Sequence, residues 1–100
     1  MNISQGRIER ALEAFEDAYD AAKDRDGHQF SPASARREAV AVALEADAPA
    51  LAEAERKGRI EGLREGLREG RIIAESHWRL NGLLTAFDAR FSELEKEEGR

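Results

Sequence analysis

The chain has 100 residues, 37% of them charged and 6% aromatic, and a formal net charge of −5 at pH 7. It has no cysteine, which excludes disulfides, thiolate metal sites and cysteine nucleophiles. The N-terminal residues have no apolar signal region, and no stretch approaches the roughly 18 apolar residues of a membrane span. We therefore expect an acidic, cytoplasmic protein with no membrane segment, and a homodimer because large apolar residues are few.

The first helix is expected over residues 4–23. Ser4 is the expected N-cap, and Ile3 with Ile8 has the spacing of a hydrophobic staple. Apolar side chains then recur at intervals of three and four residues, as one face of an amphipathic helix requires. These side chains are Ile8, Leu12, Phe15, Tyr19 and Ala22.

A loop is expected over residues 24–30, with Asp26-Gly27 as its turn signal. Ser31 is then the expected N-cap of a second, alanine-rich helix over residues 31–46, with a proline at its first helical position.

A long helix or helical hairpin is expected over residues 48–97. Asp47-Ala48-Pro49 predicts a break before it, because Asp47 can cap a helix and Pro49 is tolerated in a first turn. No further proline follows. Asn81-Gly82 leaves three alternatives open: a kink, a short turn between two helices, or an uninterrupted helix. The last part carries a strong apolar stripe, formed by Leu80, Leu83, Leu84, Phe87, Phe91 and Leu94.

Together these segments predict an all-α fold. We expect a single helical domain over residues 1–100, with three to four helices, a long C-terminal helix or hairpin, and assembly into a dimeric bundle. No run of alternating β-branched and polar residues reaches the length of a strand.

Four glycines recur at four-residue spacing in the middle of the long segment: Gly58, Gly62, Gly66 and Gly70. A glycine costs a helix interior about 1 kcal/mol relative to alanine, so we expect a neighbouring helix to pack closely against this bare ridge. On a helical wheel the ridge borders the apolar stripe, and the arginines fall on the opposite side. A tandem duplication with merely tolerated glycines is the alternative.

This stretch, KGRIEGLREGLREGR, resembles the GxxxG repeats of the regulators of the flagellar and type III secretion export ATPase. It is also similar to the glycine-glutamate repeats near the ends of some transposase-like nucleases. The resemblance is confined to about residues 58–70, and no function is carried over from either family.

We interpret the chain as a non-catalytic helical protein–protein interaction module, an adaptor or regulator without a cofactor. Its partner would be another protein or a second copy. The expected surface combines the glycine ridge with neighbouring apolar side chains: Gly58, Gly62, Gly66, Gly70, Leu63, Leu67, Ile73, Trp78, Leu80, Leu84, Phe87 and Phe91. Trp78 is interpreted as a packing residue, with a binding anchor as the alternative.

The acidic face of the first helix supports a rival hypothesis: Glu9, Glu13, Asp17, Asp20 and Asp24. A small acidic helical protein can occupy a basic groove meant for nucleic acid, as some phage-encoded inhibitors of host defence do. Residues 9–26 carry a net charge of −4 and residues 56–71 a net charge of +3, with arginines and glutamates interleaved. The interleaving argues against direct nucleic-acid binding, and the two segments could pair with each other within the chain or across a dimer.

The sequence contains no complete motif for a catalytic site or a metal site. Acidic side chains lie one turn apart on the first helix, as in the magnesium sites of all-helical nucleotide pyrophosphatases, but no second acidic pair follows Glu13, Glu16, Asp17 and Asp20. A calcium loop centred on Gly27 lacks carboxylates at its first and last positions, and neither His28 nor His77 completes a di-iron Glu-x-x-His pattern. We expect no enzyme, and a helical-bundle phosphohydrolase is the catalytic alternative.

Overall fold

The structure is a computed structural model that describes residues 3–98, with side chains described from residue 6 onward. The described part is all-helical and contains no strand, which confirms the expected fold class. Its elements are α1 (Ile3–Asp26), the 3₁₀ turn η1 (Gly27–Gln29), α2 (Pro32–Arg56), α3 (Arg59–Ser76), the 3₁₀ turn η2 (Trp78–Leu80) and α4 (Leu83–Glu98). None of these helices combines the length and apolarity that crossing a membrane requires. The expected cap at Ser4 and the staple at Ile3 fall on side chains outside the described residues.

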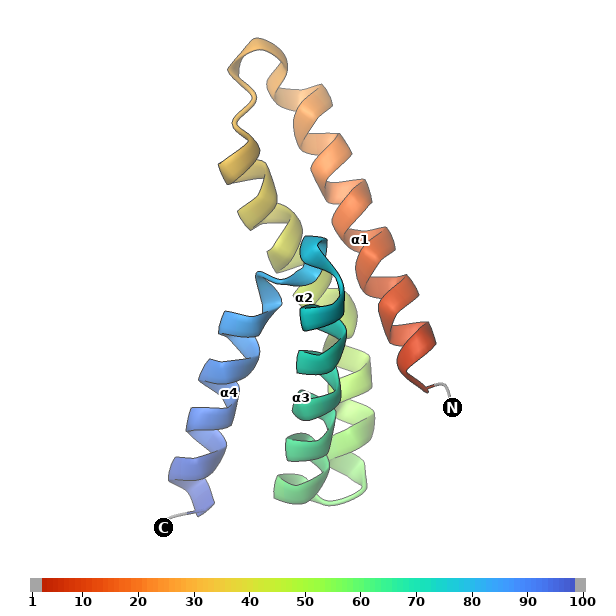
Figure 1. Ribbon diagram of the computed structural model, residues 1–100, viewed down its shortest axis with the longest axis vertical. Helices are drawn as coiled ribbons and strands as arrows, with labels where there is room; N and C mark the ends of the chain where they lie inside the picture. Colours follow the sequence, from red (N-terminus) through yellow and green to blue (C-terminus); the bar gives the residue numbers. More distant parts are fainter. Residues whose placement is uncertain (1–2, 99–100) are drawn as a thin grey trace.

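Two antiparallel hairpins make up the molecule, which measures 50 × 30 × 20 Å (Figure 1). α1 and α2 form the longer hairpin, and α3 and α4 form the shorter one. The shorter hairpin lies against the lower part of the longer one, so the upper parts of α1 and α2 project beyond it (Figure 1). We call this projecting part, residues 15–36, the arm.

Small side chains bring α1 and α2 together. On α2, Ala35, Ala39 and Ala43 are buried at four-residue spacing, and on α1 the buried positions include Ala11 and Ala22. Ridges of small residues allow two helix backbones to approach closely. The alanine-rich segment therefore packs through its methyl groups and needs few large anchors.

Arg7 and Asp47 continue these two ridges by one turn each and form a buried ion pair. Nε and Nη2 of Arg7 donate hydrogen bonds to the carboxylate of Asp47 at 2.8 and 2.6 Å, and Nη1 donates to the carbonyl oxygen of Gly66 at 2.9 Å. The two side chains are only 4% and 6% exposed. Removing one partner from a buried pair typically costs about 3–5 kcal/mol, because the other charge is left unpaired. This pair therefore ties α1, α2 and α3 together at one point.

The predicted break at Asp47-Ala48-Pro49 is wrong. α2 continues through Pro49 to Arg56, beyond the predicted end at residue 46. Packing on both sides of the proline holds the helix together, because Asp47 is bonded to Arg7 and Leu51 lies against Gly66. The chain reverses instead at residues 57–58, so the single segment expected over residues 48–97 comprises the end of α2, all of α3 and all of α4.

Asn81-Gly82 forms a turn between two helices, the second of the three alternatives. η2 precedes the turn and α4 follows it. A Cβ atom placed on Gly82 would lie 2.7 Å from Cγ2 of Val40, so the missing side chain lets the turn rest on α2.

The loop expected over residues 24–30 is shorter than predicted. α1 continues to Asp26, and η1 occupies the next three residues. Gly27 adopts a left-handed conformation with a φ of +51°, which reverses the chain. The expected cap of the second helix is confirmed, because Oγ of Ser31 accepts a hydrogen bond from the backbone N–H of Ser34 at 3.4 Å.

The positively charged segment, residues 56–71, forms ion pairs with α4. Among the described residues, no ion pair joins this segment to the acidic face of α1. Arg59 binds Glu97 at 2.6 Å, Arg71 lies 3.1 Å from Asp88, and Arg64 binds Glu98. Exposed pairs contribute about 0–1 kcal/mol each, so their role is mainly to fix the register of α3 on α4.

Three of the four ladder glycines lie within α3, and Gly58 stands before its first residue. A Cβ atom on Gly62 would overlap the carbonyl oxygen of Ala54 and come within 2.9 Å of its carbonyl carbon. On Gly66 it would lie 2.9 Å from Cβ of Ala54, and on Gly70 it would lie 2.9 Å from the ring of Phe87. The close neighbours of the ladder therefore belong to its own chain.

Gly62→Ala should destabilise the protein, because its nearest neighbour is the backbone of α2, which cannot rotate away. We expect the free energy of unfolding, measured by urea denaturation with circular dichroism, to fall by about 1–3 kcal/mol. Gly6→Ala is the matched control: its Cβ would meet only the flexible end of Arg10, at 3.4 Å. It should be neutral or stabilise α1 by about 0.5–1 kcal/mol, and equal losses in both variants would contradict the close approach.

Candidate interaction site

Most residues of the predicted surface build the chain's own core. Of this set, Leu63, Leu67, Ile73, Leu80 and Phe87 are buried, and Leu84 and Phe91 are partly buried against the core. Gly62, Gly66 and Gly70 are buried as well, and Gly58 is half-buried. Trp78 alone of this set has a largely exposed side chain, with 65% of its surface accessible. The interpretation of Trp78 as a packing residue is therefore wrong.

The local backbone explains why Trp78 points outward. α3 ends at Ser76, the backbone of His77 after it is extended, and the chain then makes the single turn of η2. Leu80, at the other end of this turn, is completely buried and anchors it. Because Leu80 points into the core, the turn carries Trp78 on its solvent side.

Two arginines hold the indole ring. The guanidinium carbon of Arg79 lies 4.9 Å from the ring centroid of Trp78, and that of Arg36 lies 5.9 Å from it. Nη2 of Arg36 also donates a hydrogen bond to the carbonyl oxygen of Trp78 at 3.2 Å. A cation–π interaction contributes about 0.5–1 kcal/mol at an exposed site. The two arginines therefore orient the indole ring in the free protein.

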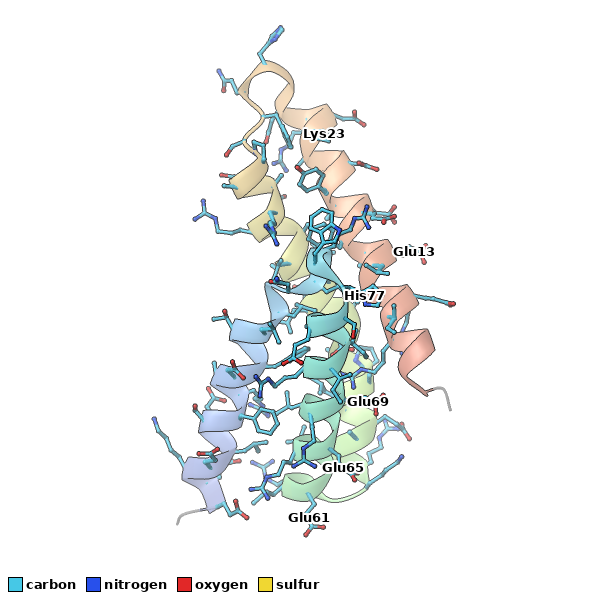
Figure 2. All side chains as sticks on the ribbon, in the orientation of Figure 1. Glu13, Lys23, Glu61, Glu65, Glu69 and His77 are labelled. Atoms are coloured by element: carbon cyan, nitrogen blue, oxygen red, sulfur yellow. The ribbon has the colours of Figure 1, made fainter. Side chains whose placement is uncertain are left out.

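Trp78 stands at the base of an open cleft of about 600 Å³ that runs up the arm, and we call this the Trp78 cleft. Its α1 wall consists of Phe15, Glu16, Tyr19, Asp20 and Lys23. Its other wall consists of Pro32, Ala33 and Arg36 of α2, with Trp78 and Arg79 of η2. Figure 2 shows Lys23 near the tip of the arm and His77 close to the base of the cleft.

An aromatic cluster stiffens the arm. The rings of Phe15 and Tyr19 stack with centroids 6.0 Å apart, and Phe30 meets Tyr19 edge-on at 5.6 Å. At the tip, Arg25 donates hydrogen bonds to Glu38 of α2 at 2.9 and 3.0 Å and to its neighbour Asp26. These bonds lower the pKa of both carboxyl groups and raise the pKa of Arg25. Arg25 thus fastens the end of α1 to α2.

The acidic face of α1 is exposed along its whole length: Glu9, Glu13, Asp17, Asp20 and Asp24. Figure 2 shows Glu13 pointing away from the rest of the molecule. None of these five carboxylates forms an ion pair with a described residue. The nearby Glu16 does form an ion pair: its Oε1 lies 3.8 Å from Nε of Arg79.

A second groove, of about 640 Å³, lies between the start of α1, the end of α2 and the start of α3. Gly62 and Gly66 line it, beside Ala50 and Ala54. Glu65 and Glu69 stand at its edge on α3, whose row of glutamates Figure 2 displays. One edge of the ladder is therefore reachable from solvent, although its bare face is covered by α2.

No three acidic or histidine side chains of the described residues come close enough to share a metal ion. Glu13, Asp17 and Asp20 belong to the solvated side of α1, as a charged amphipathic face does. His28 is exposed in η1, and a ring nitrogen of His77 lies 3.3 Å from the carbonyl oxygen of Ile73.

Sequence reasoning missed Arg7 and Asp47, although their positions carried a signal. Arg7 lies four residues before Ala11, and Asp47 lies four residues after Ala43, so each charge stands in phase with an apolar ridge. A charged residue in phase with a buried face on each of two helices indicates a buried pair. The contact of Arg36 with Trp78 had no such signal, because Arg36 comes from a distant part of the chain.

No family model matches this chain, and no curated protein or solved structure is significantly similar to it. The interpretation of the Trp78 cleft therefore rests on its own geometry.

Trp78 is the only tryptophan, so its fluorescence reports on the cleft alone. In dilute solution we expect strong quenching by iodide and weaker quenching by caesium, because Arg36 and Arg79 attract an anion to the exposed ring. Replacing both arginines with glutamine should remove the preference for iodide. Emission that resists both quenchers in dilute protein would contradict the exposed position.

Proposed function

We propose that the chain is a non-catalytic helical protein–protein interaction module, an adaptor or regulator, and that it binds through the Trp78 cleft. The observation that carries this proposal is one exposed tryptophan held between two arginines at the base of an open cleft.

Three features of the cleft support this role. Tryptophan, tyrosine and arginine are enriched at the centres of protein interfaces, and Trp78, Tyr19 and Arg36 all line this cleft. The side chains are already ordered by stacking and hydrogen bonds, which reduces the entropy lost on binding. Charged groups surround the apolar centre, as they do at the rim of many interfaces.

The GxxxG-type surface has a more limited place in this proposal. The bare face of Gly62 and Gly66 packs against α2, so a partner helix could approach the ladder only along the second groove. We propose that the ladder mainly builds the fold and that the Trp78 cleft receives the partner. We also propose that the working form is a homodimer.

The cleft can be tested by affinity capture with mass spectrometry, using lysate of the source organism. A partner retained by the wild-type chain should be lost on Trp78→Ala, because the anchor side chain is gone. Ile72→Ala is the matched control, since Ile72 is 60% exposed on α3 and lies outside the cleft. Retention of the same proteins by Trp78→Ala, or of none by the wild type, would refute this role.

A second candidate function rests on the five exposed carboxylates of the acidic face of α1, none of which forms an ion pair with a described residue. They extend over about 22 Å, at about 1.5 Å per residue. Regularly spaced negative charges on a rod suit a basic groove that normally holds a nucleic-acid backbone. We propose this alternative as a small acidic inhibitor of the anti-defence type, which would bind such a groove in a target protein.

Charge reversal on α1 separates the two functions. Glu13→Lys with Asp17→Lys changes the acidic face and leaves every residue that lines the Trp78 cleft intact. If the acidic face binds, this variant should lose a basic partner that Trp78→Ala retains. Wild-type binding should also weaken at about 1 M salt, where the Debye length is about 3 Å. Glu45→Lys with Glu95→Lys is the charge-matched control on α2 and α4, and equal binding by both double variants would exclude the alternative.

A further inference from the structure

The Trp78 cleft continues a face that is covered elsewhere in the molecule. On α2, the Val40 side chain meets the turn at Gly82, and Leu51 meets Gly66 of α3. Ala33 and Arg36 lie on the same stripe of α2, one to two turns nearer the tip, and there no helix covers them. The shorter hairpin ends at η2, so the face of the arm above it is left open (Figure 1).

The two walls of the open face have opposite charge. The α1 wall carries Glu16 and Asp20, and the remaining acidic side chains of α1 lie beside it. Arg36 and Arg79 stand on the opposite wall, and Arg37 follows on α2 in the adjoining groove. Lys23 is the one cation on the α1 wall, and it lies at the tip end, 6.0 Å from the ring centroid of Tyr19.

These charges are largely unused within one chain. Among the described residues, Asp20 has no ion pair, and Arg36 and Arg37 contact no carboxylate. Arg79 reaches Glu16 only at 3.8 Å. The open face therefore offers an acidic strip and a basic strip side by side, with Trp78 and Tyr19 near the line between them.

We propose that this face binds the same face of a second copy of the chain about a two-fold axis. An axis parallel to the line between the two strips places the acidic wall of each copy against the basic wall of the other, so that one interface pairs both sets of charges. Trp78, Tyr19 and Pro32 of the two copies form the apolar centre of this interface. The inference rests on the proposed function and names its partner and surface.

Reciprocal charge reversal tests this arrangement. Asp20→Lys places lysine opposite arginine in a homodimer, and Arg36→Glu places glutamate opposite aspartate. Each variant alone should therefore dimerise on the order of 100-fold more weakly than the wild type. An equal mixture should recover the dimer, because the introduced lysine of one copy meets the introduced glutamate of the other.

The measurement is sedimentation equilibrium of the purified full chain over a range of concentrations, with circular dichroism to confirm folding. The wild type should approach twice the 11.1 kDa mass of one chain. Trp78→Ala should weaken the dimer, Ile72→Ala should not, and iodide should quench Trp78 less as wild-type protein is concentrated. If Arg36→Glu loses helical signal, Arg37→Glu replaces it in the mixture, because Arg37 forms no hydrogen bond or ion pair with a described residue.

A monomeric wild type, or a mixture that stays monomeric, would overturn the inference. These results are separable from failure of the proposed function. A monomer that still captures another protein through Trp78 refutes the two-fold pairing and supports the interaction module. A reciprocal dimer that captures nothing else supports the pairing and refutes a role as an adaptor for another protein.

Discussion

The fold depends on the absence of side chains along one edge of α3. At Gly62 the backbone of α2 occupies the space that a methyl group would need, and at Gly70 the ring of Phe87 and the guanidinium of Arg7 do so. The carbonyl oxygen of Gly66 then accepts a hydrogen bond from Arg7, which is also bonded to Asp47. The cost of three helical glycines, about 3 kcal/mol, is offset by contacts that bring four helices to one place.

This constraint also decides where the molecule stays open. The ladder holds α3 against the end of α2, and α3 is shorter than α2, so its last turn stops part of the way along α2. η2 must reverse the chain at that level, and it leaves Trp78 in the open cleft, beside Glu16 of α1 and Arg36 of α2. The exposed tryptophan is thus a consequence of the unequal lengths of the two hairpins.

The charged residues also differ between the part of the molecule that the shorter hairpin covers and the part that it leaves open. Arginines of α3 are matched by carboxylates of α4 and are largely satisfied within the chain. On the arm, by contrast, Asp17, Asp20, Asp24 and Arg36 form no ion pair among the described residues, and Arg79 reaches Glu16 only at 3.8 Å. Because charge complementarity governs the choice and orientation of partners, we place the interaction on the arm and assign a structural role to the ladder.

The sequence by itself determined the helical class, the cap at Ser31 and the turn at Gly27, because these depend on periodicity and on local backbone preferences. It also marked the ladder as a site of close approach, since helical glycines are costly wherever they occur. Only the tertiary structure decided that α2 passes through Pro49 and that the ladder's close neighbours lie in its own chain. It also decided that Trp78 is exposed between Arg36 and Arg79. Each of these depends on contacts between residues far apart in the chain, and local propensity does not encode such contacts.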